Sequence, residues 1–502
     1  MPSCFHSIFS LLATFLSVLL LTPSCGGGGG GGGGGPPPPP PPGGIVVTIA
    51  PSGATVPIGS SQLLMAVVTG CTDCTANWSV TGGAANGTVS PAGPSAATTY
   101  TAPFSVPIPV AITVTATSNE DPTESDTATI TVADAFGAAT EFGLSGSTVP
   151  QALVIGDYDG DANQDIATAN LGTDDVAVLL GDGTGALAFN DAVITSGADP
   201  VSIAQGVFDA GAVMDVAAVN FASGPPGTVG ILLGDGAGSF TAATPATVGV
   251  GTSPQSVAAG DFDNDGSDDL AVANFISEDV TVLGSNGDGT FTVTQTIDLS
   301  GSGPYAVATG FIDGGINRDL AVADLTGGEI WILLGNGDGT FAPPPDPSVP
   351  GGTGPVALII SEFNGASADL AVVNVGIVDD DCDGLPAQPP GANQVAILLG
   401  DGLGGFGAPT TYPIGSNPRA LAAGDFNQDG NVDLVTANFC DDNISLLFGN
   451  GDGTFQAAVN YSPGVSRRPT GVAAGDLNND TFDDVVTTNA GTDNVSVFLN
   501  NN

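Results

Sequence analysis

The sequence predicts an all-β protein: a seven-bladed β-propeller of four-stranded blades over residues 135–502, preceded by a small β-sandwich over residues 44–134. Three observations lead to this fold class. The 502 residues include 76 glycines and 38 prolines, so turns are frequent. A unit of about 50 residues recurs, and each unit contains four short strands. Such units cannot bury both faces alone, so they must stack.

The charge of the chain is strongly one-sided. There are 52 acidic residues, 46 Asp and 6 Glu, against 4 arginines, for a formal net charge of −48. The preference for Asp favours turns and metal-binding loops over helices. This surface repels nucleic acid, so we expect no nucleic-acid partner.

The composition also argues against an enzyme. The chain has no lysine, and its one histidine, His6, lies in a segment that we expect to be removed. Imidazole bases, Schiff-base amines and histidine zinc ligands are therefore excluded from the mature protein.

The N-terminus has the features of an export signal. An apolar run at residues 8–21 precedes Cys25, and ten glycines and seven prolines follow it. This start resembles that of a bacterial lipoprotein, which implies acylation of Cys25, a signal over residues 1–25 and a tether over residues 26–43. The region before the apolar run has no Lys or Arg, so simple secretion after signal cleavage is the alternative. Either way we expect an extracellular or cell-surface monomer whose only membrane contact is the N-terminal anchor.

The predicted sandwich contains six β-rich runs, at residues 45–49, 62–68, 77–80, 98–101, 111–117 and 127–132. The phrases around Trp78, Tyr100 and Val114 resemble bacterial immunoglobulin-like modules, which implies an Ig-like sandwich with Trp78 in its core. Cys71 and Cys74 have the spacing of a redox motif. No βαβ context surrounds them and the compartment is oxidising, so we expect a local disulfide.

The repeats are recognised by two residues. We call the first of each unit the framed proline: Pro150, Pro200, Pro254, Pro304, Pro355, Pro418 and Pro469. Fourteen or fifteen residues later comes the framed aspartate, before an apolar strand: Asp165, Asp215, Asp269, Asp319, Asp369, Asp433 and Asp484. The seventh unit lacks its fourth strand, and residues 135–144 supply it from the other end of the repeat region. The two ends should therefore complete one blade.

The loop before the framed aspartate has the pattern of a calcium loop in four repeats. Oxygen ligands at positions 1, 3, 5 and 9 can surround one hard cation, and Gly at position 6 permits a sharp turn. The predicted calcium ligands are Asp157, Asp159, Asp161 and Asp165; Asp261, Asp263, Asp265 and Asp269; Asp425, Asn427, Asp429 and Asp433; and Asp476, Asn478, Asp480 and Asp484. We expect about four structural Ca²⁺ sites.

These loops resemble the FG-GAP/VCBS repeats of integrin-α-like propellers over all of residues 135–502. The resemblance implies seven blades, with structural calcium between the first two strands of a blade. Three repeats depart from the pattern: repeat two has Val207 and Gly211 at positions 1 and 5, repeat four has Phe311 and Gly315, and repeat five has Glu362 in a shorter loop. We expect little or no metal there.

The loops after strands two and four share the rim opposite the calcium loops. Arg419, Arg467 and Arg468 lie there, and they can hold an acidic ligand. The alternative is pairing with Asp441, Asp442 or Asp493.

We expect a binding or adhesion module for a protein or glycan. A calcium-assisted polysaccharide lyase or carboxylate glycosidase on the same scaffold is the second hypothesis, because it needs only carboxylates. A purely structural surface component is the third.

Two further cysteines occupy equivalent loops of neighbouring repeats. Cys440 follows the second strand of repeat six, and Cys382 lies in the insertion that lengthens repeat five to 63 residues. We therefore predict a Cys382–Cys440 disulfide. The alternative is an additional calcium loop formed by Asp379, Asp381 and Asp383.

Overall fold

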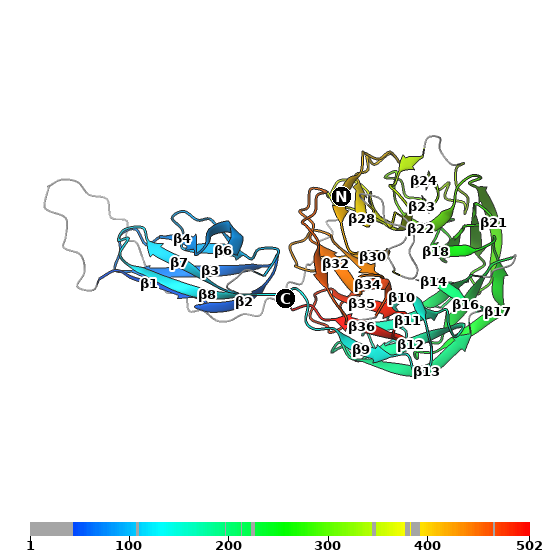
Figure 1. Ribbon diagram of the computed structural model, residues 1–502, viewed down its shortest axis with the longest axis horizontal. Coiled ribbons are helices and arrows are strands. Elements are labelled where there is room, and N and C mark those ends of the chain that lie inside the picture. The colour runs from blue at the N-terminus through cyan, green and yellow to red at the C-terminus, as the bar shows by residue number, and fades with distance from the viewer. Residues whose placement is uncertain are drawn as a thin grey trace, which may run out of the picture. The chain divides into compact units, whose positions relative to one another are not determined.

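The computed structural model describes residues 44–106, 110–195, 197–211, 213–221, 226–343, 348–376, 382, 392–464 and 467–501 (Figure 1). Strands make up 53% of it, and no α-helix occurs in these ranges. Within the same ranges, no helix has the length and hydropathy to cross a membrane. The predicted signal, Cys25, the tether, Asp379, Asp381 and Asp383 all lie outside the described residues.

Residues 44–134 form two four-stranded sheets with a common core. One sheet has the order β1 (Val46–Ala50), β3 (Ser61–Thr69), β6 (Ala97–Thr101), β5 (Thr88–Ser90), and the other β2 (Gly53–Pro57), β8 (Ser125–Ala133), β7 (Ala111–Ser118), β4 (Ala76–Val80). A short 3₁₀ turn, η1 (Gly83–Asn86), connects β4 to β5. Buried residues alternate with exposed ones along β1 and β8, as expected for strands that cover a core with one face. Trp78 and Tyr100 lie in that core.

All six predicted runs of this region are strands, but two strands were not predicted. β2 begins at a glycine and ends at a proline, and it pairs with β8 in parallel. β5 has only three residues. Neither contains the long alternating pattern by which a strand is recognised in a sequence.

The remaining described residues form seven four-stranded antiparallel sheets, which we number one to seven in the chain order of their first strands. The first strands begin at the framed prolines: β10 (Pro150–Gly156), β14 (Pro200–Gly206), β18 (Pro254–Gly260), β22 (Pro304–Gly310), β26 (Pro355–Ser361), β30 (Pro418–Gly424) and β34 (Pro469–Gly475). The second strands begin at the framed aspartates: β11 (Asp165–Asn170), β15 (Asp215–Asn220), β19 (Asp269–Asn274), β23 (Asp319–Asp324), β27 (Asp369–Asn374), β31 (Asp433–Asn438) and β35 (Asp484–Asn489).

The third and fourth strands complete each sheet. The third strands are β12 (Asp175–Gly181), β16 (Thr228–Gly234), β20 (Asp279–Ser285), β24 (Glu329–Leu333), β28 (Gln394–Leu398), β32 (Asn443–Leu447) and β36 (Asn494–Phe498). The fourth strands are β13 (Leu187–Thr195), β17 (Phe240–Gly249), β21 (Phe291–Asp298), β25 (Val349–Pro350), β29 (Thr410–Pro413), β33 (Val459–Tyr461) and, for sheet seven, β9 (Thr140–Gly143). Every second strand is buried along its whole length, because both faces of each sheet are covered by neighbouring sheets.

Neighbouring sheets are joined in the same way around the series. Each first strand lies beside the next one, and β34 of sheet seven lies beside β10 of sheet one (Figure 1). The carbonyl of Leu477 in sheet seven accepts a 3.0 Å hydrogen bond from Gly185 in sheet one. In the equivalent hydrogen bond between sheets one and two, the N–H of Gly238 donates to the carbonyl of Tyr158. β9 pairs with β36, so a segment before the first repeat provides the last strand of sheet seven, as the sequence predicts.

Candidate metal loops and central pocket

The four predicted calcium loops fold back on their own side chains. In sheet three, Asp261 accepts hydrogen bonds from the backbone N–H groups of Asp265 and Gly266, both at 3.1 Å. Asp263 accepts from Asp265 at 3.1 Å, and Asp265 accepts from Ser267 at 2.8 Å. These bonds curl the chain so that alternate side chains converge. The loops of sheets six and seven repeat the same pattern.

Two of the loops bring three carboxylates within 4.8 Å of one another. The clusters are Asp157, Asp159 and Asp165 in sheet one, and Asp261, Asp263 and Asp265 in sheet three. Desolvation raises the pKa values of Asp159 and Asp263 above their usual range. The negative charges of the adjacent carboxylates raise these pKa values further. None of the four loops contains a Lys or Arg. A divalent cation with a preference for oxygen would fit this arrangement, since it would neutralise charges that otherwise repel.

The framed aspartates have a second role, which the sequence did not reveal. In every sheet, one carboxylate oxygen accepts the N–H at position 2 of the loop, and the other accepts an N–H at the end of the third strand. In sheet one Asp165 accepts from Tyr158 and Gly181, both at 2.8 Å. The equivalent pairs of bonds occur in the other six sheets. The framed aspartate therefore fastens the loop to the sheet even where positions 1 and 5 of the loop have no carboxylate, as in sheets two and four.

Burial of these aspartates changes their acidity. The pKa of Asp165, Asp269 and Asp484 is raised to about 6 and that of Asp433 to about 8, mainly by desolvation. Backbone hydrogen bonds oppose this effect and other loop carboxylates add to it. A bound cation would favour the charged form.

The loops of sheets two, four and five keep part of the geometry. Asp209 and Asp313, at position 3, accept the N–H two residues ahead at 2.6 and 2.7 Å, as Asp263 does. Positions 1 and 5 have no carboxylate in sheets two and four. Among the described residues, the loops of sheets two and four thus form the turn without the cluster.

Position 6 takes a left-handed conformation in all four acidic loops. The predicted glycines Gly266 and Gly430 have φ of 96° and 83°, but Ala162 and Thr481 occupy the same conformation with φ of 71° and 75°. The turn therefore forms without glycine in two loops, at a cost in backbone strain.

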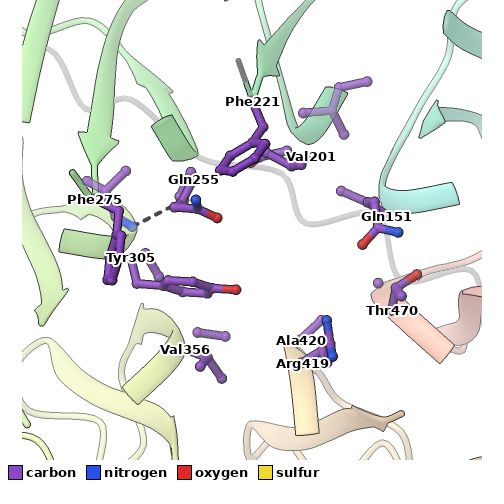
Figure 2. Close-up of a pocket in the computed structure, with 18 of the residues that line it drawn as sticks. Gln151, Val201, Phe221, Gln255, Phe275, Tyr305, Val356, Arg419, Ala420 and Thr470 are labelled. Atoms are coloured by element: carbon purple, nitrogen blue, oxygen red, sulfur yellow. Dashed lines mark hydrogen bonds between the residues drawn. The ribbon is translucent and has the colours of Figure 1, made fainter. Parts of the chain in front are cut away.

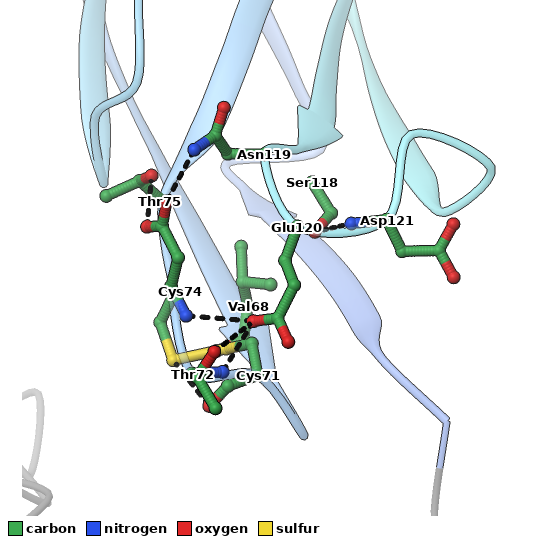
Figure 3. The surroundings of a disulfide bond; sticks show 10 residues. Val68, Cys71, Thr72, Cys74, Thr75, Ser118, Asn119, Glu120 and Asp121 are labelled. Atoms are coloured by element: carbon green, nitrogen blue, oxygen red, sulfur yellow. Dashed lines mark hydrogen bonds between the residues drawn. A yellow bond between two sulfur atoms is a disulfide. The ribbon is translucent and has the colours of Figure 1, made fainter. Parts of the chain in front are cut away.

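Both cysteine pairs lie at bonding distance in the structure. The Cα atoms of Cys382 and Cys440 are 5.3 Å apart, within the range that a disulfide requires, and the two sulfur atoms are bonded. Cys71 and Cys74 are bonded as well, also with a Cα separation of 5.3 Å (Figure 3). The carboxylate of Glu120 accepts the N–H of Asp73 beside this second pair.

The three candidate arginines have different surroundings. Arg467 forms an ion pair with Glu141 of β9, and not with the Asp residues considered from the sequence, because β9 lies beside β36. Arg419 lies over the ring of Phe439 at 4.2 Å, and Arg468 lies 5.4 Å from the same ring. Arg419 alone of the three lines the central pocket described next.

The pocket, with a volume of about 750 Å³, lies among the first strands of all seven sheets (Figure 2). The residue after each framed proline lines it, and we call this set the variable ring: Gln151, Val201, Gln255, Tyr305, Val356, Arg419 and Thr470. The next residue of each strand is small in every sheet: Ala152, Ser202, Ser256, Ala306, Ala357, Ala420 and Gly471. Framed prolines pair with the last residue of the second strand, so the variable ring lies at the end of the sheets opposite the metal loops.

Sequence reasoning missed this pocket, although a signal was present. The position after the framed proline changes from repeat to repeat, while the positions around it hardly change. A second overlooked residue is the buried polar one that ends each second strand, Asn in six sheets and Asp324 in sheet four. In sheets one and three this Asn donates to the first residue of the third strand, as Asn170 does to Asp175 at 2.8 Å. An apolar residue follows it, and Leu171, Phe221, Phe275 and Leu325 line the pocket.

The fold and the loops together define a β-repeat protein with acidic turns. The family described as FG-GAP-like repeat matches residues 208–272, 369–436 and 425–487, which lie in sheets two to three, five to six and six to seven. The chain thus carries FG-GAP-like repeats at three places, and these support an FG-GAP repeat protein. No curated protein matches the chain.

Proposed function

We propose that the chain is an extracellular, calcium-stabilised β-propeller of seven blades that acts as a binding module and not as an enzyme. The observation that carries the proposal is the common construction of the seven sheets. A turn fastened by the framed aspartate follows each first strand, four of these turns carry the full acidic pattern, and the variable ring lies at the other end of the sheets. An invariant frame that presents one variable position per repeat is typical of a scaffold for recognition.

Three contacts support seven blades in a closed ring. Sheet seven lies beside sheet one, Leu477 bonds to Gly185 across that junction, and one pocket is lined by all seven first strands. The two sheets of residues 44–134 have the size and layering of an immunoglobulin-like domain, which we propose as a spacer between the propeller and an N-terminal lipid anchor at Cys25.

Calcium would be held by oxygen ligands at positions 1, 3, 5 and 9 of the loops in sheets one, three, six and seven. The clusters of sheets one and three support this directly, and the loops of sheets six and seven share their hydrogen bonds. The cation would supply charge neutralisation and would fix the loop. Carbonyls at position 2 accept bonds from the next sheet, so a fixed loop would also stabilise the junction between blades.

The binding of a protein or glycan is proposed for the face opposite the loops, and the chemistry of the chain supports binding without turnover. The predicted mature chain lacks Lys and His. Within the described ranges, the acidic clusters lie in tight turns, and the residues that line the pocket include no carboxylate. A glycosidase would need two carboxylates facing one substrate.

Calcium titration of the chelator-treated protein, followed by calorimetry and thermal melting, tests the proposal. We expect about four sites and a higher melting temperature with calcium. Equal melting temperatures in calcium and in chelator would contradict the metal assignment. Incubation with a glycan array should give binding without cleavage, and product release would restore the enzyme hypothesis.

A further inference from the structure

Three of the four acidic loops belong to consecutive sheets. We name each loop after its sheet, so that loop six is the one before Asp433. Sheets six and seven follow one another in the chain, and sheet seven lies beside sheet one. Loop three, by contrast, lies between loops two and four, which have no carboxylate at positions 1 and 5. A contact between adjacent loops can therefore connect two candidate metal sites in the first group.

The side chain of Asp483 joins loop seven to loop six. Asp483 occupies position 8 of loop seven, between Asp480 and Asp484. Its carboxylate accepts the backbone N–H of Asp425, at position 1 of loop six, at 3.1 Å. Asp483 and Asp425 are both half-buried, so water competes only in part for this bond. A Cβ atom at Gly424 would lie 2.8 Å from the same carboxylate oxygen, so a larger residue there would displace the carboxylate.

The bond from Asp483 restrains the first proposed ligand of loop six. The N–H after Asp425 is that of Phe426, and it donates to Asp433 at 3.0 Å. Carboxylates therefore hold the backbone on both sides of the Asp425 Cα atom, and with it the direction in which its side chain leaves the loop. One of these two restraints comes from loop seven. Groups that orient a ligand in this way contribute to metal affinity without touching the metal.

Two further contacts join the same pair of loops. Gln428, at position 4 of loop six, donates to the carbonyl of Thr481 in loop seven at 3.0 Å. The side-chain amide of Asn500 donates to the carbonyls of Phe426 and Asp483 at 2.8 and 3.0 Å. Fixing one loop should therefore help to order the other.

We infer that Asp483 is a positioning residue for calcium in loop six and that it makes loops six and seven bind calcium cooperatively. Asp480 and Asp484 flank Asp483 in the sequence, so their attachment to a cation fixes the Asp483 carboxylate as the acceptor for Asp425. Because such coupling is reciprocal, occupation of loop six favours occupation of loop seven to the same degree. The inference rests on the proposed function, since it concerns regulation of the calcium sites.

Asp268 provides a matched comparison. It occupies position 8 of loop three, and its carboxylate accepts the N–H of Val207, at position 1 of loop two, at 2.9 Å. This is the same bond between neighbouring loops, but Val207 has no side-chain oxygen to offer a cation. The residue before the framed aspartate is acidic in no other repeat. The bond from Asp268 should therefore stabilise a junction without coupling two metal sites.

Calcium titration calorimetry of the chelator-treated full chain tests the coupling. The background Asp157→Ala/Asp261→Ala removes the predicted sites of loops one and three and leaves those of loops six and seven. We expect the second calcium to bind at least about fivefold more tightly than two independent sites would allow. Adding Asp483→Ala should reduce this factor to less than about twofold. Independent sites before that substitution, or cooperativity unchanged by it, would overturn the inference.

A protein with one remaining site tests the positioning role. Adding Asp476→Ala to the same background leaves only loop six. Here Asp483→Ala should weaken calcium binding about tenfold, since a hydrogen bond to a charged group contributes that much. Asp268→Ala should leave the affinity unchanged. Asp483→Asn keeps an oxygen acceptor, so it should weaken binding by a smaller factor, and it serves as the test where Asp483→Ala does not fold.

Unchanged affinity of loop six in both Asp483 variants, or an equal loss in Asp268→Ala, would overturn the positioning role. Melting temperatures in chelator identify any variant whose loss of affinity comes from unfolding. Calcium binding by independent sites would leave the proposed function standing and remove only this inference. Absence of calcium binding in the unmodified chain would remove both.

Discussion

At the scale of single residues, the acidic loops use side chains and backbone for different purposes. Asp at position 3 has the same backbone hydrogen bond in sheets two, three and four, so this bond alone marks the turn. Of these three sheets, only sheet three has carboxylates at positions 1 and 5 that complete a cluster. Turn formation and metal affinity can therefore be separated by mutation at equivalent positions.

Asp263→Ala and Asp209→Ala form such a pair. Both remove one hydrogen bond to a backbone N–H two residues ahead. Asp263→Ala should also abolish the contribution of calcium at that loop, about 2.7 kcal/mol at 100 times the dissociation constant. Melting curves with and without calcium should show a reduced calcium effect in Asp263→Ala and an unchanged one in Asp209→Ala. An equal reduction in both variants would argue against a site in sheet three.

Position 6 offers a stabilising substitution. Ala162 has a φ of 71°, which costs an L-residue about 1–2 kcal/mol, whereas glycine adopts it without strain. Ala162→Gly should raise the free energy of unfolding by about 1 kcal/mol, measured by denaturant titration. The exposed Ala186 does not have a positive φ, and Ala186→Gly should lower the same quantity by about 0.5–1 kcal/mol. Destabilisation by both changes would show that loop one is not strained.

At the scale of the loop and its strands, the framed aspartate acts as a fastener. Asp215 is buried and accepts the N–H groups of Phe208 and Gly234, both at 2.8 Å. The exposed Asp235 also accepts two N–H groups, from Ala237 and Ser239. Water can replace Asp235 but not Asp215.

Asp215→Ala should therefore lower the free energy of unfolding by about 2–5 kcal/mol, because the buried N–H of Phe208 and the half-buried N–H of Gly234 lose their acceptor. Asp235→Ala should change it by less than about 1 kcal/mol. Denaturant unfolding at constant calcium measures both. A similar change in the free energy of unfolding for the two variants would show that Asp215 does not fasten the loop to the sheet.

Protonation of the framed aspartates gives the metal-free protein a definite pH dependence. Burial raises their folded pKa values, to about 6 for Asp165, Asp269 and Asp484 and to about 8 for Asp433, above those of exposed Asp. Protonation thus favours the folded state, and its contribution is lost as pH rises through these values. Without calcium, the melting temperature should rise between pH 8 and pH 5.5.

With calcium, the trend should weaken or reverse, because a cation bound as proposed would favour the charged carboxylates. Asp433→Asn should show a smaller rise in the metal-free protein, which separates this effect from the general relief of negative charge. A metal-free melting temperature that falls on acidification would contradict the assignment of burial as the dominant cause.

At the scale of the whole molecule, the spacing of the repeats could be predicted from the sequence, whereas the contacts between distant repeats could not. Fixed spacing from the framed proline to the framed aspartate located the first two strands of every sheet. β2 and β5 were missed because they are short and lack alternation. The Arg467–Glu141 pair joins residues 326 positions apart, and the variable ring consists of residues about 50 positions apart, so both depend on how the sheets come together.

The Cys382–Cys440 bond connects sheets five and six and should stabilise the whole. Its sequence separation of 58 residues corresponds to about 4 kcal/mol in the chain-entropy view. The double variant Cys382→Ser/Cys440→Ser should lose up to that amount in denaturant unfolding. The Cys71–Cys74 bond spans a sequence separation of only 3 residues. The double variant Cys71→Ser/Cys74→Ser should therefore lose less free energy of unfolding. A larger loss in the second variant would contradict this account.

Because β9 pairs with β36, the last sheet can be completed only late in synthesis of the chain. Glu141 of β9 meets Asn494 across a sequence separation of 353 residues. At about 5–20 residues per second, the ribosome needs about 20–70 s to supply the partner of β9. For that time the nascent chain carries an unpaired edge, which is short and bears Glu141. A short strand and a charged side chain both discourage pairing with a strand of another chain. β9 can therefore remain unpaired until β36 has been synthesised.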